Sequence, residues 1–145
     1  MGNDFFSDGD ARLVVGIGSA LVDIIVPASE EFVGRSGVPK GGMVYFDADT
    51  IQQVLQRADG EARVVPGGAA CNTILGVAAL GGETRFLGKC GQDEFGRIFK
   101  KDLHQNSVDP FLVQTPTPTG RVLSLITPDS QRTMLTYLGA AAEMT

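Results

Sequence analysis

The chain has 145 residues, of which 43% are apolar and 20% charged, and its formal net charge is −5 at pH 7. This length and composition are typical of one globular domain with a substantial core. The net negative charge and the scattered lysines and arginines argue against a nucleic-acid surface, and no apolar run is long enough for a membrane span, so we expect neither partner.

The ends and the cysteines indicate where such a chain resides. The N-terminus lacks a basic segment followed by an apolar run, so no secretory signal is expected and a cytoplasmic location is favoured. Cys71 and Cys90 are then expected to be reduced thiols. The single histidine, His104, has no cysteine or second histidine nearby, which argues against a zinc site. Residues 1–12 are polar and are expected to form a tail.

Strand-like and helix-like patterns alternate over residues 13–105. Apolar, β-branched runs predict strands, and apolar residues that recur every three or four positions predict helices. The expected strands lie at 13–18, 24–26, 43–46, 63–65 and 84–88, and the expected helices at 28–34, 47–58, 68–80 and 91–105. This alternation is typical of a parallel sheet with helices on both faces, and therefore of an α/β fold.

The pattern changes after residue 110. A short strand at 111–113 and a proline-rich loop at 116–120 precede two strands, 121–127 and 133–138. Their tight connection predicts a β-hairpin. Residues 140–145 then resemble the middle of a connection, so we expect the chain to stop partway through a larger fold.

Two features near the N-terminus, a glycine-containing segment and an aspartate, suggest a functional interpretation. Gly16-Ile17-Gly18 looks like the start of a dinucleotide fingerprint, but Leu21 occupies the third glycine position and no helix follows, so a nicotinamide or flavin site is not expected. Asp23 lies between two strand-like runs. It is either a solvated turn residue or a carboxylate held in a cleft.

The segment Pro66-Gly67-Gly68 joins a strand to a helix of small residues, in which Asn72 is the one strongly polar side chain of the first turn. Adjacent glycines allow close approach to the backbone, and the first turn of a helix has N–H groups without internal partners. The segment is therefore either a tight packing turn or a site for a ligand with hydroxyl or anionic groups.

Four short sequence segments, taken together in chain order, carry a resemblance to a known family. They are Gly16-Ile17-Gly18-Ser19 with Asp23, Pro66-Gly67-Gly68 with Asn72, the run Leu87 to Gly96, and Pro118-Thr119-Gly120. Together they resemble the N-terminal part of a PfkB-type, ribokinase-like carbohydrate or nucleoside kinase, from about Leu13 onward. The segment 39–45 and the end at 138–142 are similar to the adenosine kinase branch in particular.

The resemblance implies a three-layer αβα fold with a small β lid, here at about 22–27, 43–47, 121–127 and 133–138 within an incomplete kinase domain over 13–145. It implies that Asp23 binds substrate hydroxyls, with Ser19, Gly67, Gly68 and Asn72 beside it. Lid contacts would come from Met43 or Tyr45 and from Met134 or Thr136.

The resemblance also implies an activity: transfer of the ATP γ-phosphoryl group, assisted by Mg²⁺, to a hydroxyl of a sugar or nucleoside. The family's glycine-rich motif with the catalytic base, and its ATP site, have no counterpart in these 145 residues, so the chain alone is expected to be inactive. Ser19 and Ala69 depart from common family residues and leave the acceptor open.

Other hypotheses remain at this point. The chain could be a binding or regulatory module without chemistry, or a truncation product with no activity of its own. Expected partners are the small-molecule acceptor, a second copy bound through the lid strands, or the C-terminal half of the kinase.

Overall fold

The computed structural model describes residues 12–144, so the expected tail lies, apart from Arg12, outside the described part. The α/β class is confirmed. The strands are β1 (Val14–Ile17), β2 (Leu21–Pro27), β3 (Met43–Tyr45), β4 (Arg63–Gly67), β5 (Thr84–Gly91), β6 (Val108–Thr115), β7 (Gly120–Ile126) and β8 (Arg132–Tyr137). The helices are α1 (Glu30–Arg35), α2 (Ala48–Gln56), α3 (Ala69–Ala79), α4 (Glu94–Gln105) and the 3₁₀ helix η1 (Gly139–Glu143).

Local chemistry explains where the helices begin. Ser29, Asp47 and Asp93 are the N-caps of α1, α2 and α4, and each side chain accepts a hydrogen bond from an N–H of its own first turn. Helix α2 therefore begins at Ala48, directly after its cap Asp47. Helix α3 differs because its N-cap is Gly68, which offers no side-chain acceptor.

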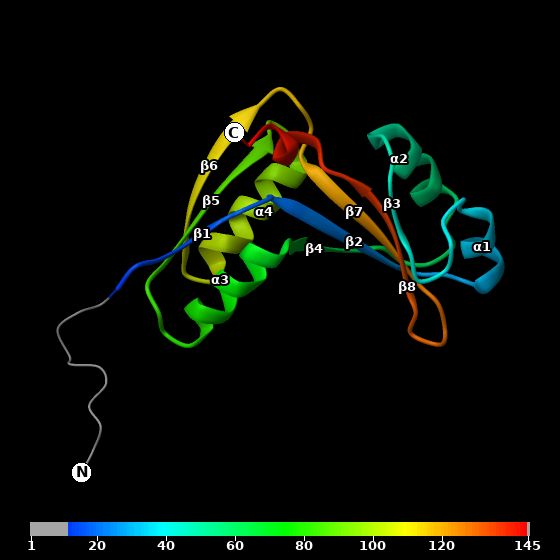
Figure 1. Cartoon of the computed structure of the whole chain (residues 1–145), viewed down its shortest axis with the longest axis horizontal. Helices are drawn as coiled ribbons and strands as arrows, with labels where there is room; N and C mark the ends of the chain where they lie inside the picture. Colours follow the sequence, from blue (N-terminus) through cyan, green and yellow to red (C-terminus); the bar gives the residue numbers. More distant parts are fainter. Residues whose placement is uncertain (1–11, 145) are drawn as a thin grey trace, which may run out of the picture.

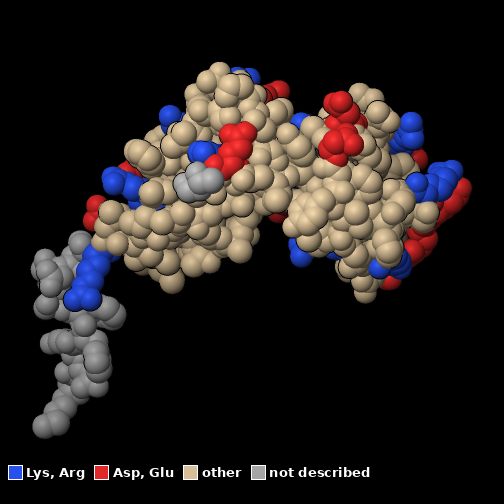
Figure 2. Space-filling model, turned by 45° about the horizontal axis from the view of Figure 1, so that its top comes forward, with Lys and Arg blue, Asp and Glu red and all other residues tan. Residues whose placement is uncertain are grey.

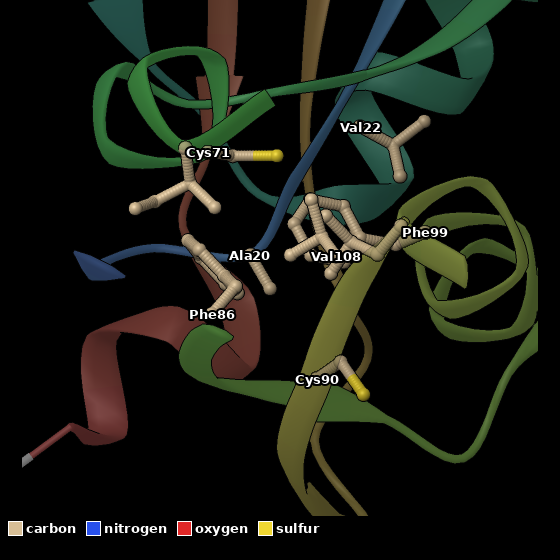
Figure 3. Packing of buried hydrophobic residues seen from close by; sticks show 9 residues of the cluster. Ala20, Val22, Cys71, Phe86, Cys90, Phe99 and Val108 are labelled. Carbon is tan, nitrogen blue, oxygen red and sulfur yellow. The ribbon is translucent and has the colours of Figure 1, made fainter. Parts of the chain in front are cut away.

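Sheet A contains only parallel strands, in the order β1-β5-β6 (Figure 1). Helices α3 and α4 pack on one of its faces and share a core with it. This core includes Cys71 from α3, Phe99 from α4 and Phe86 from β5 (Figure 3). The rings of Phe86 and Phe99 have centroids 5.4 Å apart and are tilted by 58°, a favourable aromatic arrangement. Cys71 and Cys90 are free thiols buried in the same core.

Sheet B is mixed, in the order β3-β8-β7-β2-β4. Strand β2 runs parallel to β7 and antiparallel to β4, while β7 and β8 form the expected hairpin. Four of its strands overlap the segments expected for the lid. Strand β4 also belongs to this sheet, so the strand before the Pro-Gly-Gly turn pairs with β2 and not with the strands of sheet A.

One face of sheet B is covered by α1 and α2, at the far end of the molecule from sheet A (Figure 1). Ile24, Leu123 and Leu135 lie side by side across three strands and are buried against Val33 and Ile51 of these helices. Figure 2 shows that the molecule narrows between the part built on sheet A and the part that carries α1 and α2.

Two sheet faces have no α-helix over them in the described part of the chain. On sheet A this is the face of Val15, Ile17, Leu87 and Phe111, so the expectation of helices on both faces is met on one face only. On sheet B it is the face that carries Asp23. Among the described residues, no helix is long and apolar enough to cross a membrane.

Candidate functional site

The strand register places most of the predicted site residues in two adjacent rows on one face of sheet B. The first row runs across all five strands as Tyr45, Thr136, Val122, Asp23 and Val65. The second runs as Met43, Met134, Ser124, Ile25 and Arg63. Residues two apart on a strand share a face, so both rows lie on the same side, which we call the Asp23 face.

Asp23 lies within β2, not between two strands, because β2 begins already at Leu21. It is half-buried, and its carboxylate lies against Gly67 on the neighbouring strand β4. A Cβ placed on Gly67 would stand 2.6 Å from Asp23 Cγ, which real side chains do not tolerate. The glycine is therefore required by the closeness of the carboxylate.

Gly68 turns the chain from β4 into α3 with a φ of +97°, a conformation that favours glycine. A Cβ here would also lie 2.7 Å from the carbonyl oxygen of Ser19. Ser19, Gly67, Gly68 and Asp23 thus meet where β2 and β4 reach the start of α3. The first α3 N–H that donates to the Gly68 carbonyl is that of Asn72, so the earlier ones have no partner within the helix.

Asn72 lies in the first turn of α3 and is exposed. The arrangement at this end of sheet B therefore combines a carboxylate acceptor, an uncapped helix N-terminus and an exposed amide. This set of groups can bind a molecule that carries several hydroxyls.

The lid candidates differ in exposure. Tyr45 and Met43 are 62% and 50% exposed on the edge strand β3, and Met134 is partly buried beside Met43. Thr136 is only 3% exposed, and its hydroxyl has no hydrogen-bond partner among the described residues. A buried hydroxyl without a partner costs free energy, so Thr136 offers an unused donor and acceptor in the row of Asp23.

Arg132 is a charged residue of this region that sequence inspection did not single out. It lies on β8 two residues before Met134, and therefore on the Asp23 face. Burial raises the pKa of Asp23 above its ordinary value, and the positive charge of Arg132 partly offsets the rise. No local motif marks this arginine, because its relation to Asp23 depends on three strands being adjacent.

A shallow hollow of about 630 Å³ lies at the outer end of sheet B. Its lining is mostly apolar and includes Ile25 of the second row, together with Pro27, Ala28, Ser29, Ile126, Thr127 and Pro128. Apolar surface therefore extends along β2 from Ile25 to Pro27, away from Asp23.

The two cysteines are not candidate nucleophiles. Burial, with the charges of Asp102 and Asp23, raises the pKa of Cys71 to about 12, and burial raises that of Cys90 as well. Both thiols stay protonated at neutral pH, and a thiol is a poor nucleophile compared with its thiolate.

The described residues do not fit a resident Mg²⁺ ion, because no group of three or more histidine, cysteine, aspartate or glutamate side chains is gathered among them. On the Asp23 face, the carboxylate of Asp23 has an arginine as its charged neighbour and no second carboxylate in the two rows. We therefore assign no metal-dependent step to this chain.

Comparison with known proteins agrees with the fold. Adenosine kinase from Sinorhizobium meliloti is 36% identical, with a TM-score of 0.81, over 93% of this chain and 42% of that chain. A probable sugar kinase from Rhizobium etli is 34% identical, with a TM-score of 0.81, over 91% of this chain and 40% of that chain. The fold is thus the N-terminal part of a ribokinase-like kinase fold.

Curated relatives include fructokinases. Probable fructokinase-4 of Arabidopsis thaliana is 28% identical over 95% of this chain and 36% of its own length. Fructokinase of Klebsiella pneumoniae is 38% identical over 47% of this chain and 22% of its own length. The chain therefore spans less than half the length of these relatives. Residues 13–145 match the pfkB family of carbohydrate kinases, and the chain belongs to that family.

Proposed function

We propose that this chain is the acceptor-binding part of a kinase that phosphorylates a hydroxyl of a nucleoside, with adenosine as the leading candidate. The observation that carries the proposal is the pair of rows on the Asp23 face. Asp23 and Thr136 supply polar groups in the first row, and Met43, Met134 and Ile25 supply an apolar surface in the second.

A nucleoside has the same two parts. The ribose carries vicinal hydroxyls, which an ionised carboxylate accepts as charge-assisted hydrogen bonds. The base is a flat aromatic ring, and methionine side chains adapt well to such rings and make favourable sulfur–aromatic contacts. In this proposal Asp23, Ser19, Gly67, Gly68 and Asn72 hold the ribose, while Met43, Tyr45, Met134 and Thr136 contact the base.

Sheet B would act as the lid over this acceptor. Its other face is covered by α1 and α2, so the Asp23 face is the one available to a ligand. The 36% identity to an adenosine kinase over 93% of this chain is compatible with a nucleoside acceptor, while the sugar kinase and fructokinase relatives make fructose the competing acceptor. We assign no proton transfer to this chain. In this proposal the catalytic base and the sites for ATP and Mg²⁺ lie in the remainder of a longer protein.

Calorimetric titration of residues 1–145 with adenosine, 2′-deoxyadenosine and fructose tests the proposal. We expect saturable binding of adenosine, weaker binding of 2′-deoxyadenosine by about tenfold or more because one hydroxyl is missing, and loss of binding in Asp23→Ala. The control Asp49→Ala removes an exposed carboxylate of α2 and should bind normally.

Several results would contradict the proposal. Binding of fructose but not of adenosine would replace the nucleoside by a sugar. No binding of any of the three would remove the acceptor-binding role of the isolated chain. Turnover of ATP by residues 1–145 in a coupled assay with adenosine would overturn the placement of the catalytic base elsewhere.

A further inference from the structure

The motif around Asp93 and the motif Pro118-Thr119-Gly120 lie far apart in the sequence, yet they form one hydrogen-bonded unit. Asp93 Oδ2 accepts a bond of 2.8 Å from the Thr119 backbone N–H, and Asp93 Oδ1 accepts one of 2.6 Å from the Thr119 hydroxyl. The Gly91 N–H in turn donates to Thr119 Oγ1 at 2.8 Å. Thr119 is fully buried.

The hydrogen bonds of Asp93 do more than cap α4. As the N-cap of α4, Asp93 needs only its bond from the Gly96 N–H, which is 2.9 Å long. The side chains of the other two polar N-caps, Ser29 and Asp47, bond within their own first turns. Asp93 alone among these three also bonds a residue 26 positions later. Although partial burial acts to raise the pKa of Asp93, the bonds from Thr119 and Gly96 and the charge of Arg121 lower it overall.

The residue after Thr119 begins a strand that leads to the acceptor site. Gly120 is the first residue of β7 and pairs with Leu21 of β2, which pairs on its other side with Gly67 of β4. Asp23 lies two residues beyond Leu21, with its carboxylate against Gly67. The row Gly120–Leu21–Gly67 is therefore the support on which Asp23 is held.

A second contact crosses the same junction. The guanidinium of Arg121 lies 5.2 Å from the ring centre of Phe95, on α4, and 5.8 Å from that of Tyr137, on β8. Phe95 packs against the cores of both sheets. The start of β7 is thus joined to α4 by the Asp93 carboxylate on one side of Gly120 and by Arg121 on the other.

We propose that Asp93 is a positioning residue for the acceptor site: its carboxylate holds Thr119, and so fixes the start of β7 and the row that carries Asp23 and Gly67. Asp93 does not touch the acceptor. This inference rests on the proposed function for its effect on ligand binding, but its effect on the strands can be measured without a ligand.

The test separates capping from positioning. Asp93→Ser keeps an oxygen that can cap α4 but cannot bond both groups of Thr119. We expect amide hydrogen exchange in residues 21–23 and 120–123 to rise about tenfold, while exchange within α4 stays unchanged. The matched control Asp47→Ser makes the same change at the N-cap of α2 and should leave residues 21–23 and 120–123 unchanged.

A second pair of variants covers the case in which Asp93→Ser does not fold. Thr119→Ser keeps the hydroxyl and should retain slow exchange, whereas Thr119→Val removes it and should speed exchange at the same residues. In adenosine titrations, Asp93→Ser and Thr119→Val should weaken binding about tenfold, and Thr119→Ser should retain the wild-type affinity.

The inference is overturned if Asp93→Ser and Thr119→Val leave exchange in residues 21–23 and 120–123 at the wild-type rate, or if exchange rises uniformly over the chain. Absence of adenosine binding by the wild-type chain would contradict the proposed function alone, because the exchange measurement would still decide the role of Asp93.

Discussion

The carboxylate of Asp23 lies directly against the backbone of Gly67, and a Cβ on Gly67 would stand 2.6 Å from Asp23 Cγ. The two residues lie on neighbouring antiparallel strands, where Asp23 pairs with Val65 and Gly67 pairs with Leu21. Position 67 therefore decides where the carboxylate points, and this relationship makes the acceptor site testable without changing Asp23 itself.

Gly67→Ala should displace the Asp23 carboxylate and weaken adenosine binding by about tenfold or more, since the new methyl group takes the space that the carboxylate occupies. Gly76→Ala is the control. Gly76 lies in the middle of α3 and is exposed, and a Cβ there meets nothing within 4 Å. Because alanine favours the helix more than glycine does, the variant should gain up to about 1 kcal/mol in stability. Equal affinities for the two variants, measured by calorimetry, would contradict the close packing of Asp23 on Gly67.

Asp23→Asn should increase the stability of the protein and weaken its binding of adenosine. Burial raises the pKa of Asp23 in the folded protein, so the folded state favours the protonated carboxyl and the free energy of unfolding falls as pH rises through the range above 3.8. The asparagine amide does not ionise, so this fall in the free energy of unfolding is absent from the variant. We expect the variant to be more stable than the wild type at neutral pH, by an amount that solvent screening of a half-buried group reduces.

At a pH below the ordinary pKa of aspartate, the two proteins should have the same stability, because Asp23 is then protonated in the wild type too. Thermal unfolding at the two pH values measures this difference. Adenosine affinity should be low for Asp23→Asn at neutral pH, and for the wild type it should fall as pH is lowered through the pKa of Asp23. A variant less stable than the wild type at neutral pH would show that the carboxylate has a stabilising partner.

Thr136→Val tests the unused hydroxyl in the row of Asp23. The variant should be as stable as the wild type or more stable by about 1 kcal/mol, because a buried hydroxyl without a partner is removed. Adenosine binding should weaken about tenfold if the ligand supplies the partner. Thr133→Val, the matched control on the same strand, removes the acceptor of the Gly41 N–H and should lose about 1–3 kcal/mol of stability.

Chemical denaturation measures the stability of the two threonine variants, and calorimetry measures their affinity for adenosine. A loss of stability in Thr136→Val as large as that in Thr133→Val would mean that the hydroxyl is already satisfied in the free protein.

The uncovered face of sheet A should make residues 1–145 self-associate. Ile17 is 64% and Phe111 is 59% exposed on this face, with Val15, Leu87 and Val113 around them. Contiguous apolar surface of this kind, next to the edge strand β1, favours contact with another chain. Under the proposed function, the remaining part of the kinase would cover this face.

Light scattering over a range of concentrations should therefore detect association, and Phe111→Lys should reduce it. Leu80→Lys is the control, because Leu80 is the most exposed large apolar side chain among the described residues but lies at the end of α3, away from this face. A concentration-independent monomer for the wild type, or equal effects of both substitutions, would contradict the prediction.

Much of the local structure could be predicted from the sequence. The periodicity of α2 and α4 and the turn at Pro66-Gly67-Gly68 depend on residues close together in the sequence, so the chain itself contains the signal. The order of the four motifs was sufficient to identify the PfkB family.

Other features depend on which strands become neighbours. The sequence predicts β2 only at 24–26, with Asp23 in the connection from the strand at 13–18, because Ser19, Ala20 and Asp23 interrupt the apolar pattern. In the structure β2 is one strand, held on one side by β4 and on the other by β7, whose pairing residues lie about one hundred positions later. No local pattern encodes such a pairing, since hydrogen bonds between strands depend on tertiary contacts.

The residues and their order were sufficient to determine the family, the class of fold and the identities of the polar groups that could bind an acceptor. The tertiary structure alone decided that Asp23 and Thr136 share a row, that Arg132 faces the same side, and that Asp93 reaches Thr119. The physical reason is that each of these relations is a contact between segments far apart in sequence, whose geometry exists only once the sheets have formed.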